Sequence, residues 1–270
     1  MRKWLCVNLV LLLSPLALAQ VKLSGDIIQG GLVLGKTQAD AQVFFDEQAL
    51  TVSTQGDFVF GFGRDDISDH QLVIKFANGE QEQRTLTPKK REYRIQRVEG
   101  IAKKIMNPNP KAVARAKQDS QQVKQARSQL TANTAFAQGF IAPIDGTITG
   151  VYGSQRFYNG QPKSPHYGLD YAGNIGDPVK APADGTVVLY VPDMFYSGGT
   201  MIIDHGHGIS SSFLHLSDAY VKSGDKVSQG QVVAAVGKSG RATGPHLDWR
   251  INWFQQRLDP ALALKVSPIK

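Results

Sequence analysis

The alternation of apolar and polar side chains predicts β-strands in the first third of the chain. Phenylalanines occupy every second position of residues 58–62, and apolar side chains occupy every second position of residues 72–76. A period of two is typical of a strand that buries one of its faces. Turn signals stand before the first run, at residues 55–57, and after the second, at residues 78–79. We therefore expect residues 20–98 to form a small, antiparallel, β-sandwich-like module.

The spacing of apolar residues changes to three or four, with one longer gap, after this module. Asn109 can cap a helix, Pro110 suits its first position, and no glycine or proline follows before Gly139. We expect a basic helical linker over residues 99–138, which either holds two β domains apart or lies across one of them. Its apolar stripe is thin and consists of Val113, Ala116, Val123, Ala126 and Leu130.

From about Gly139 the chain returns to short β-rich runs between Gly, Pro and Asp turns. Residues 186–190 and 231–236 are such runs, and two Ala-Pro-x-Asp-Gly segments, at 142–146 and 181–185, look like related corners. This pattern predicts an antiparallel sheet folded on itself, over residues 139–265. The whole chain is therefore expected to be mostly β.

The first residues predict a secretory signal peptide. Arg2 and Lys3 precede a short apolar run, and residues 17–19 have the small-x-small pattern of a cleavage site. The run is too short to span a bilayer well, and no later run reaches the roughly 20 residues that a spanning helix needs. We expect residues 1–19 to be removed and the protein to act in the periplasm without a stable membrane anchor; a retained N-terminal anchor is the alternative.

Composition and charge narrow the chemistry. The single cysteine, Cys6, lies in the predicted signal, so the mature chain has no disulfide framework, cysteine nucleophile or thiolate metal site. The net charge of +7 is concentrated between Lys89 and Arg127, where twelve basic residues stand against three acids. Outside the cytosol such a segment suits an anionic envelope surface better than nucleic acid. The alternative is that these charges belong to a solvent-exposed helix and bind no partner.

Three histidine motifs lie in the predicted C-terminal domain. HYGLD contains His166 and Asp170, FLHLS contains His215, and GPHLD contains His246 and Asp248. Residues two or four apart on a strand point to the same side, so each pair could reach one ion. Each motif alone is more typical of the solvent-exposed face of a strand, but the three together are far more specific for a functional site.

The remaining histidines carry weaker signals. His205 and His207 adjoin glycines and are interpreted as residues of a hairpin loop, and His70 has no obvious partner.

The order of these motifs resembles the lysostaphin/LytM-type zinc metallopeptidases, which are bacterial cell-wall endopeptidases. The resemblance covers roughly residues 139–262 and includes GLDYAGNIGDPVKAPADGTVV and GGTMIIDHGHGISSSFLHLS. It implies that His166 and Asp170 bind Zn²⁺, and that His215 and His246 act as catalytic residues beside the metal. The family's third zinc ligand is a histidine, and this chain has Asp248 at that position.

Asp248 can still offer a ligand, because strand alternation places it on the face of His246. Two carboxylates give the ligand set a formal charge of −2, against −1 in the family, so the metal should activate water less. Oxygen-rich ligation also favours harder ions such as Mn²⁺. Restoring a histidine at position 248 should then raise zinc affinity.

Three functions remain open from the sequence. The first is a metal-dependent endopeptidase that hydrolyses peptide bonds in peptidoglycan cross-links or stems, with loops at residues 152–165 and 190–199 forming its groove. The second is a weak or inactive LytM-type domain that binds the cell wall and regulates other wall hydrolases. The third is a biotinyl- or lipoyl-type carrier with Lys238 as the modified residue, against which a secretory signal argues. Peptidoglycan is the expected partner; a regulatory protein partner and the oligomeric state stay open.

Overall fold

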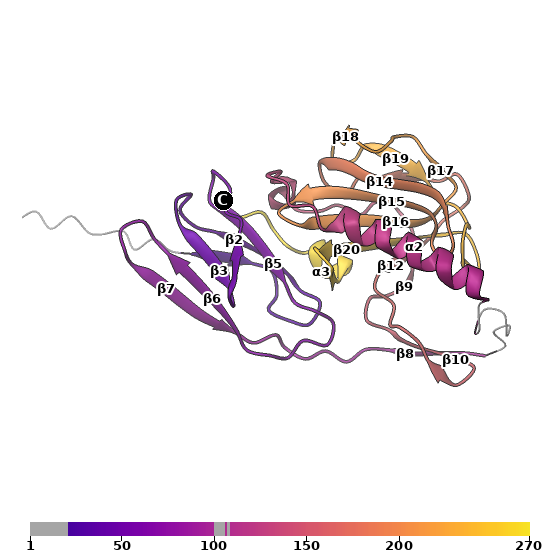
Figure 1. Cartoon of the computed structure of the whole chain (residues 1–270), viewed down its shortest axis with the longest axis horizontal. Helices are drawn as coiled ribbons and strands as arrows, with labels where there is room; N and C mark the ends of the chain where they lie inside the picture. Colours follow the sequence, from indigo (N-terminus) through magenta and orange to yellow (C-terminus); the bar gives the residue numbers. More distant parts are fainter. Residues whose placement is uncertain (1–20, 100–105, 107–108) are drawn as a thin grey trace, which may run out of the picture.

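The computed structural model describes residues 21–99, 106 and 109–270, and the chain is mostly β. The predicted signal peptide lies outside the described residues. Figure 1 shows an elongated molecule with a small β module at one end and a larger β domain at the other. Among the described residues, no helix has the length and apolar character needed to cross a membrane.

The N-terminal module consists of two antiparallel sheets, in the strand orders β1-β2-β5 and β4-β3-β6-β7. The alternating positions of residues 58–62 and 72–76 point into its core, where Phe58, Phe60, Leu72 and Ile74 are fully buried. The rings of Phe45 and Phe60 stack at 4.7 Å and join the two sheets. The strands are β1 Lys22–Ser24, β2 Leu32–Lys36, β3 Gln42–Phe45, β4 Gln48–Leu50, β5 Asp57–Gly61, β6 His70–Lys75 and β7 Gln81–Leu86.

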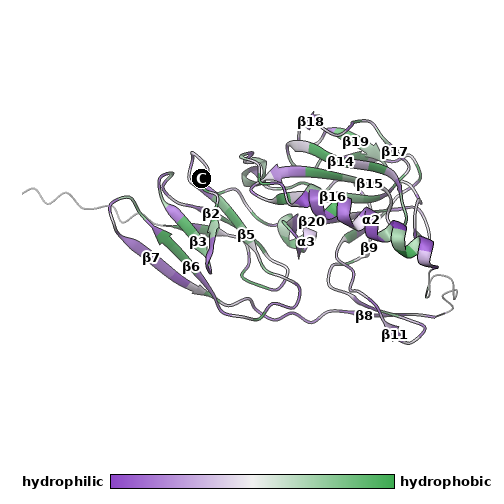
Figure 2. Cartoon of the chain, in the orientation of Figure 1, coloured by the Kyte–Doolittle hydropathy of each residue, from purple (hydrophilic) through white to green (hydrophobic). Residues whose placement is uncertain are grey.

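The C-terminal domain is built on one large sheet with the order β18-β14-β15-β16-β20-β12-β9, and β21 pairs with β20. A smaller sheet, β13-β19-β17, and the hairpin β10-β11 complete it. The apolar residues of the central strands, shown in green in Figure 2, form its core. The strands are β9 Ile148–Gly150, β10 Gln155–Tyr158, β11 Gln161–Pro162, β12 Leu169–Ala172, β13 Pro178–Lys180, β14 Gly185–Met194, β15 Gly198–Gly206, β16 Ile209–Leu216, β17 Asp218–Ala219, β18 Lys226–Val227, β19 Val232–Ala235, β20 His246–Trp253 and β21 Gln256–Leu258.

The described residues between the two β regions include a short strand and a long helix. Strand β8, Ile95–Val98, runs parallel to β10 and so attaches the chain to the C-terminal domain. Helix α2 spans Pro110–Arg127, and the side chain of Asn109 caps it by accepting a 2.8 Å hydrogen bond from the Ala112 amide, as the sequence predicts. The helix lies across β14 and β15 (Figure 1), which is one of the two arrangements expected.

The contact face of α2 contains part of the predicted apolar stripe: Ala126 is buried, and Ala116 and Val123 are half-buried. Val113 is 51% exposed and Leu130, beyond the helix, is 60% exposed. Asp119 and Arg127 are buried as well: Asp119 accepts a 2.7 Å hydrogen bond from the Phe195 amide, and Arg127 donates to a strand hydroxyl. Helix α2 therefore docks through two buried polar side chains as well as through part of its apolar stripe.

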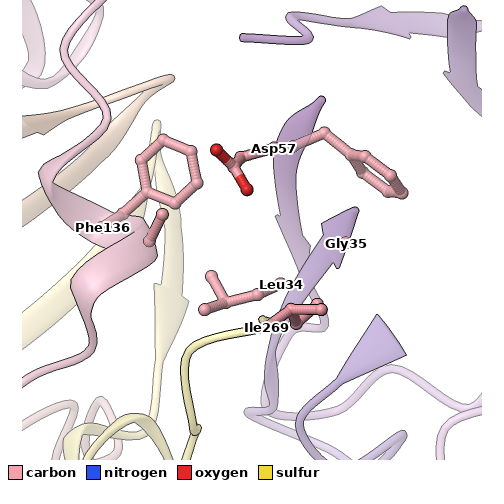
Figure 3. Close-up of a pocket in the computed structure, with 7 residues that line it drawn as sticks. Leu34, Gly35, Asp57, Phe136 and Ile269 are labelled. Carbon is pink, nitrogen blue, oxygen red and sulfur yellow. The ribbon is translucent and has the colours of Figure 1, made fainter. Parts of the chain in front are cut away.

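The N-terminal module packs directly against the C-terminal domain. Buried Asp259 forms an ion pair with Arg91 at 2.8 Å and caps the short helix α3, Pro260–Ala263. The 3-10 helix η1, Ala135–Gln138, also reaches this seam. Figure 3 shows a small cavity there, where Asp57 and Leu34 of the module meet Phe136 of η1. One hydrophobic core runs through both parts. The domain boundaries at residues 98 and 139 stay a prediction.

Candidate metal centre

Neighbouring strands bring the predicted metal ligands together. Asp170 in β12 lies directly opposite Asp248 in β20. His166 lies just before β12 rather than on the strand, where its amide donates to the Ser154 carbonyl at 2.9 Å. His166, Asp170 and Asp248 are buried, and each offers a ligand atom within 4.8 Å of the other two. Among the described residues, this is the group of acidic and histidine side chains that could hold a metal ion.

Two glycines make room for the carboxylates. A Cβ atom at Gly168 would lie only 2.1 Å from Oδ1 of Asp248. A Cβ atom at Gly150, in β9, would lie 2.2 Å from Oδ2 of Asp170. Any larger residue at either position would therefore push a carboxylate out of place.

The donor atoms of this group fit a bound cation. Both ring nitrogens of His166 and Oδ1 of Asp170 are buried without a hydrogen-bond partner in the described part of the chain. Nε2 of His166 lies 3.0 Å from Oδ1 of Asp170, but the pair lacks hydrogen-bond geometry. Like charges directly opposite one another on a sheet are unfavourable. A divalent ion among His166, Asp170 and Asp248 would satisfy these atoms and offset the repulsion.

An arginine that the sequence reasoning missed is bound to Asp248. Nε and Nη2 of Arg250 donate to the two carboxylate oxygens of Asp248 at 2.9 Å and 2.6 Å. Burial alone would raise the pKa of Asp248, but the charge and hydrogen bonds of Arg250 outweigh burial and hold the pKa well below its usual range. The sequence did contain a signal for this contact: Arg250 follows Asp248 by two residues, so strand alternation places both on the same face. A second arginine, Arg156, approaches Asp170 less closely, at 3.7 Å.

The two predicted catalytic histidines lie side by side. The ring centroids of His215 and His246 are 4.7 Å apart. Nδ1 of His215 lies 2.8 Å from the Ser239 carbonyl, and Nδ1 of His246 lies 2.9 Å from the Gly244 carbonyl. These contacts place the proton of each neutral ring on Nδ1 and leave the lone pair on Nε2. Burial lowers the pKa of His215, which favours its neutral form.

The other histidines depart from two sequence interpretations. His205 is not a loop residue: it lies in β15, is fully buried, and contacts the Asp184 carbonyl and the Ser211 hydroxyl. Its neighbour His207 does lie in the turn before β16. His70 does have partners, since its two ring nitrogens lie 2.8 Å and 3.0 Å from carboxylates of the N-terminal module.

Two aromatic residues in the loops of the predicted groove, Phe157 and Tyr196, contact cations. The Arg97 guanidinium lies over the Phe157 ring at 4.7 Å, and that of Arg241 lies over the Tyr196 ring at 3.7 Å. Lys238, the residue that a carrier would modify, is exposed but does not lie at the tip of a hairpin, because β19 pairs with β13 and β17. The groove stays a prediction.

Comparison with known proteins defines the class of the C-terminal domain. Residues 164–260 match the family model of peptidase family M23. The chain thus carries an M23 domain of the LytM type, as the motif order predicts. A crystal structure of a Pseudomonas aeruginosa protein described as an M23 peptidase aligns with a TM-score of 0.67 at 26% identity, covering 89% of this chain and 96% of that one.

Curated relatives align with about a third of the chain. Peptidoglycan DD-endopeptidase ShyA of Vibrio cholerae is 43% identical over 88 residues, which are 33% of this chain and 20% of that protein. DD-carboxypeptidase/endopeptidase Mpg of Neisseria meningitidis is 35% identical over 103 residues, which are 38% of this chain and 24% of that protein. The chain spans about a fifth to a quarter of the length of these relatives.

Proposed function

We propose that the C-terminal domain is a metal-dependent endopeptidase that hydrolyses peptide bonds in peptidoglycan. The observation that carries this proposal is the convergence of His166, Asp170 and Asp248 at the junction of β12 and β20. The names of the M23 relatives, which include peptidoglycan DD-endopeptidases, support the substrate class. The predicted signal peptide agrees with a periplasmic site of action.

His166, Asp170 and Asp248 would hold a zinc ion, which supplies a Lewis acid that polarises an amide carbonyl and activates water. The two remaining histidines would handle the protons. Nε2 of either His215 or His246 can accept a proton from the attacking water, because Nδ1 of each ring is engaged by a backbone carbonyl. The same rings, once protonated, can stabilise the oxyanion and return a proton to the leaving amine.

Metal analysis of the mature chain, coupled to digestion of purified peptidoglycan, tests this function. We expect about one equivalent of zinc per chain and the release of new peptide ends, both lost after chelation. If the analysis finds Mn²⁺ in place of zinc, the identity of the metal in this proposal changes and the proposed reaction stays the same. His215→Ala should abolish digestion while zinc stays bound, and His70→Gln, in the N-terminal module, should leave both unchanged. Bound zinc without any new peptide ends would contradict the proposal.

One observation favours a second candidate, a weak or inactive domain that binds the wall and regulates other hydrolases. Asp248 is already neutralised by a bidentate contact with Arg250, so its attraction for a cation is reduced. This candidate predicts that the protein sediments with intact peptidoglycan but contains no metal and releases no peptide ends. The same experiment therefore distinguishes the two functions.

A further inference from the structure

Arg250 changes the charge of the candidate metal centre. With a neutral His166, the two carboxylates of Asp170 and Asp248 give the three ligands a formal charge of −2. Arg250 stays protonated in proteins and adds +1 at hydrogen-bond distance from Asp248. The four residues together carry −1. A ligand set of two histidines and one aspartate carries the same charge.

We propose that Asp248 and Arg250 act as one unit that replaces a neutral third ligand of the metal centre. This inference rests on the proposed function. Asp248 supplies the ligand oxygen, and Arg250 cancels the charge that an aspartate adds. Arg250 is thus a positioning residue: it touches neither the metal nor the substrate, and it acts through the carboxylate that it holds.

The geometry of the pair leaves the carboxylate able to bind a metal. Arg250 uses one lone pair on each oxygen of Asp248, and each oxygen has a second lone pair. A bidentate contact also fixes the plane of the carboxylate, which a monodentate contact would not. Ligating carboxylates are commonly hydrogen-bonded in this way by residues outside the ligand set. Because Asp248 is only 3% exposed, water cannot take over that task.

The surroundings of Arg250 bind it tightly to its partner. Arg250 lies in a group of cations with Arg127 of α2 and Arg257 of β21. Burial, and after it the charges of Arg257 and Arg250, lower the pKa of Arg127 to about 9. Arg250 itself is stabilised as a cation by Asp248 and, more weakly, by Asp170. A buried cation in such a cluster needs a carboxylate beside it. Loss of Asp248 would leave Arg250 exposed to repulsion from its neighbours.

This arrangement reverses the expectation for Asp248→His. From the sequence alone, restoring the family ligand should raise zinc affinity. With Arg250 in place, the substitution instead leaves the Arg250 cation unpaired beside the metal ion. The three ligands and Arg250 together then carry a net charge of zero. We expect Asp248→His to weaken zinc binding about tenfold or more, within the 10- to 100-fold range known for residues that support metal ligands.

The double variant Asp248→His/Arg250→Gln is the decisive test. It removes both charges, restores a net −1, and should recover most of the affinity lost in Asp248→His. Zinc dissociation constants are measured on the mature full-length chain by competition with a chromophoric chelator, and circular dichroism verifies folding. Arg84→Gln, which breaks an ion pair with Glu82 in the N-terminal module, is the matched control and should bind zinc like the wild type.

The outcomes separate this inference from the proposed function. If Asp248→His binds zinc as tightly as the wild type, or if the double variant recovers nothing, Arg250 has no compensating role and the inference is overturned. If the affinities follow the expected order but the wild type releases no peptide ends, the endopeptidase proposal fails and the inference holds. A wild-type chain that binds no zinc would overturn both. If the Asp248→His chain does not fold, the test compares the wild type with the double variant. Their zinc dissociation constants should differ by less than about tenfold.

Discussion

Asp170 and Asp248 face each other directly across two paired strands, and both carboxylates are buried. Opposed like charges destabilise a sheet unless a cation lies between or beside them. Arg250 offsets one of the two charges, at Asp248, while Asp170 keeps only the longer contact with Arg156. The fold thus maintains an unfavourable charge pair at the position where a metal ion would offset it, which points to a binding function.

The first prediction concerns Asp170→Asn. Without metal, the free energy of unfolding should stay unchanged or rise by up to about 1 kcal/mol, because the substitution removes the repulsion with Asp248. Zinc at 100 times its dissociation constant should stabilise the wild type by about 2.7 kcal/mol, and the variant hardly at all. Thermal or urea unfolding with and without zinc measures both effects. Equal stabilisation of the two proteins by zinc would show that Asp170 is no ligand.

The glycines beside the carboxylates give a second prediction. Gly168→Ala should lower zinc affinity at least about tenfold. The new Cβ would lie 2.1 Å from Oδ1 of Asp248 and would push this oxygen out of its position. Gly150→Ala should have a similar effect through Oδ2 of Asp170, which it would approach to 2.2 Å. Chelator competition gives the affinities, and unfolding of the metal-free proteins shows whether the fold survives. Tight zinc binding by both folded variants would place the ion elsewhere.

The sequence predicts which side chains of the metal centre share a strand face, because this follows from strand alternation. His246 and Asp248 share a face because they are two apart in β20, and the pairing of β12 with β20 brings Asp170 opposite Asp248. The sequence could not supply that register, which decides the distance between the carboxylates. Arg250 obeys the same alternation, but an arginine on a strand usually faces solvent, so its contact with Asp248 needed coordinates.

Other parts of the fold depended on tertiary contacts that local pattern does not contain. The apolar spacing and the cap of α2 predicted its existence and its start at Pro110. Its docking face could be predicted only in part: Ala126 of the apolar stripe is buried, but Asp119 and Arg127 also bind backbone and hydroxyl groups of the C-terminal domain. His205 was misplaced because Gly206 suggested a turn, whereas β15 continues through both residues.

A third prediction concerns the pH dependence of stability through His70. Burial alone would lower the pKa of His70, but hydrogen bonds to Asp46 and Asp66 outweigh it and raise the pKa above its usual value. A raised pKa in the folded state adds stability that is fully present below the unfolded value of about 6.5. That stability is lost as the pH rises through the folded pKa.

Urea unfolding of the wild type and His70→Gln, at intervals from about pH 6 to about pH 9, measures this effect. The difference in unfolding free energy between the two proteins should be largest at the acidic end and shrink as the pH rises. Zinc is left out, so that the metal centre contributes equally to both. A difference that stays constant over this interval would show that His70 does not titrate with a raised pKa.

The last prediction concerns the buried cation of α2. Arg127 donates a 2.8 Å hydrogen bond from Nη2 to the Ser212 hydroxyl, while its Nε has no partner in the described part of the chain. Arg127→Met keeps the length of the side chain and removes both the desolvated charge and its repulsion with Arg250. Because replacing buried charges with apolar groups is often stabilising by 1–4 kcal/mol, we expect a gain of about 1 kcal/mol after the loss of the hydrogen bond. Lys124→Met, an exposed site on the same helix, should change stability by less than about 0.5 kcal/mol. A clear loss of stability in Arg127→Met would mean that the charge of Arg127 holds α2 on the sheet.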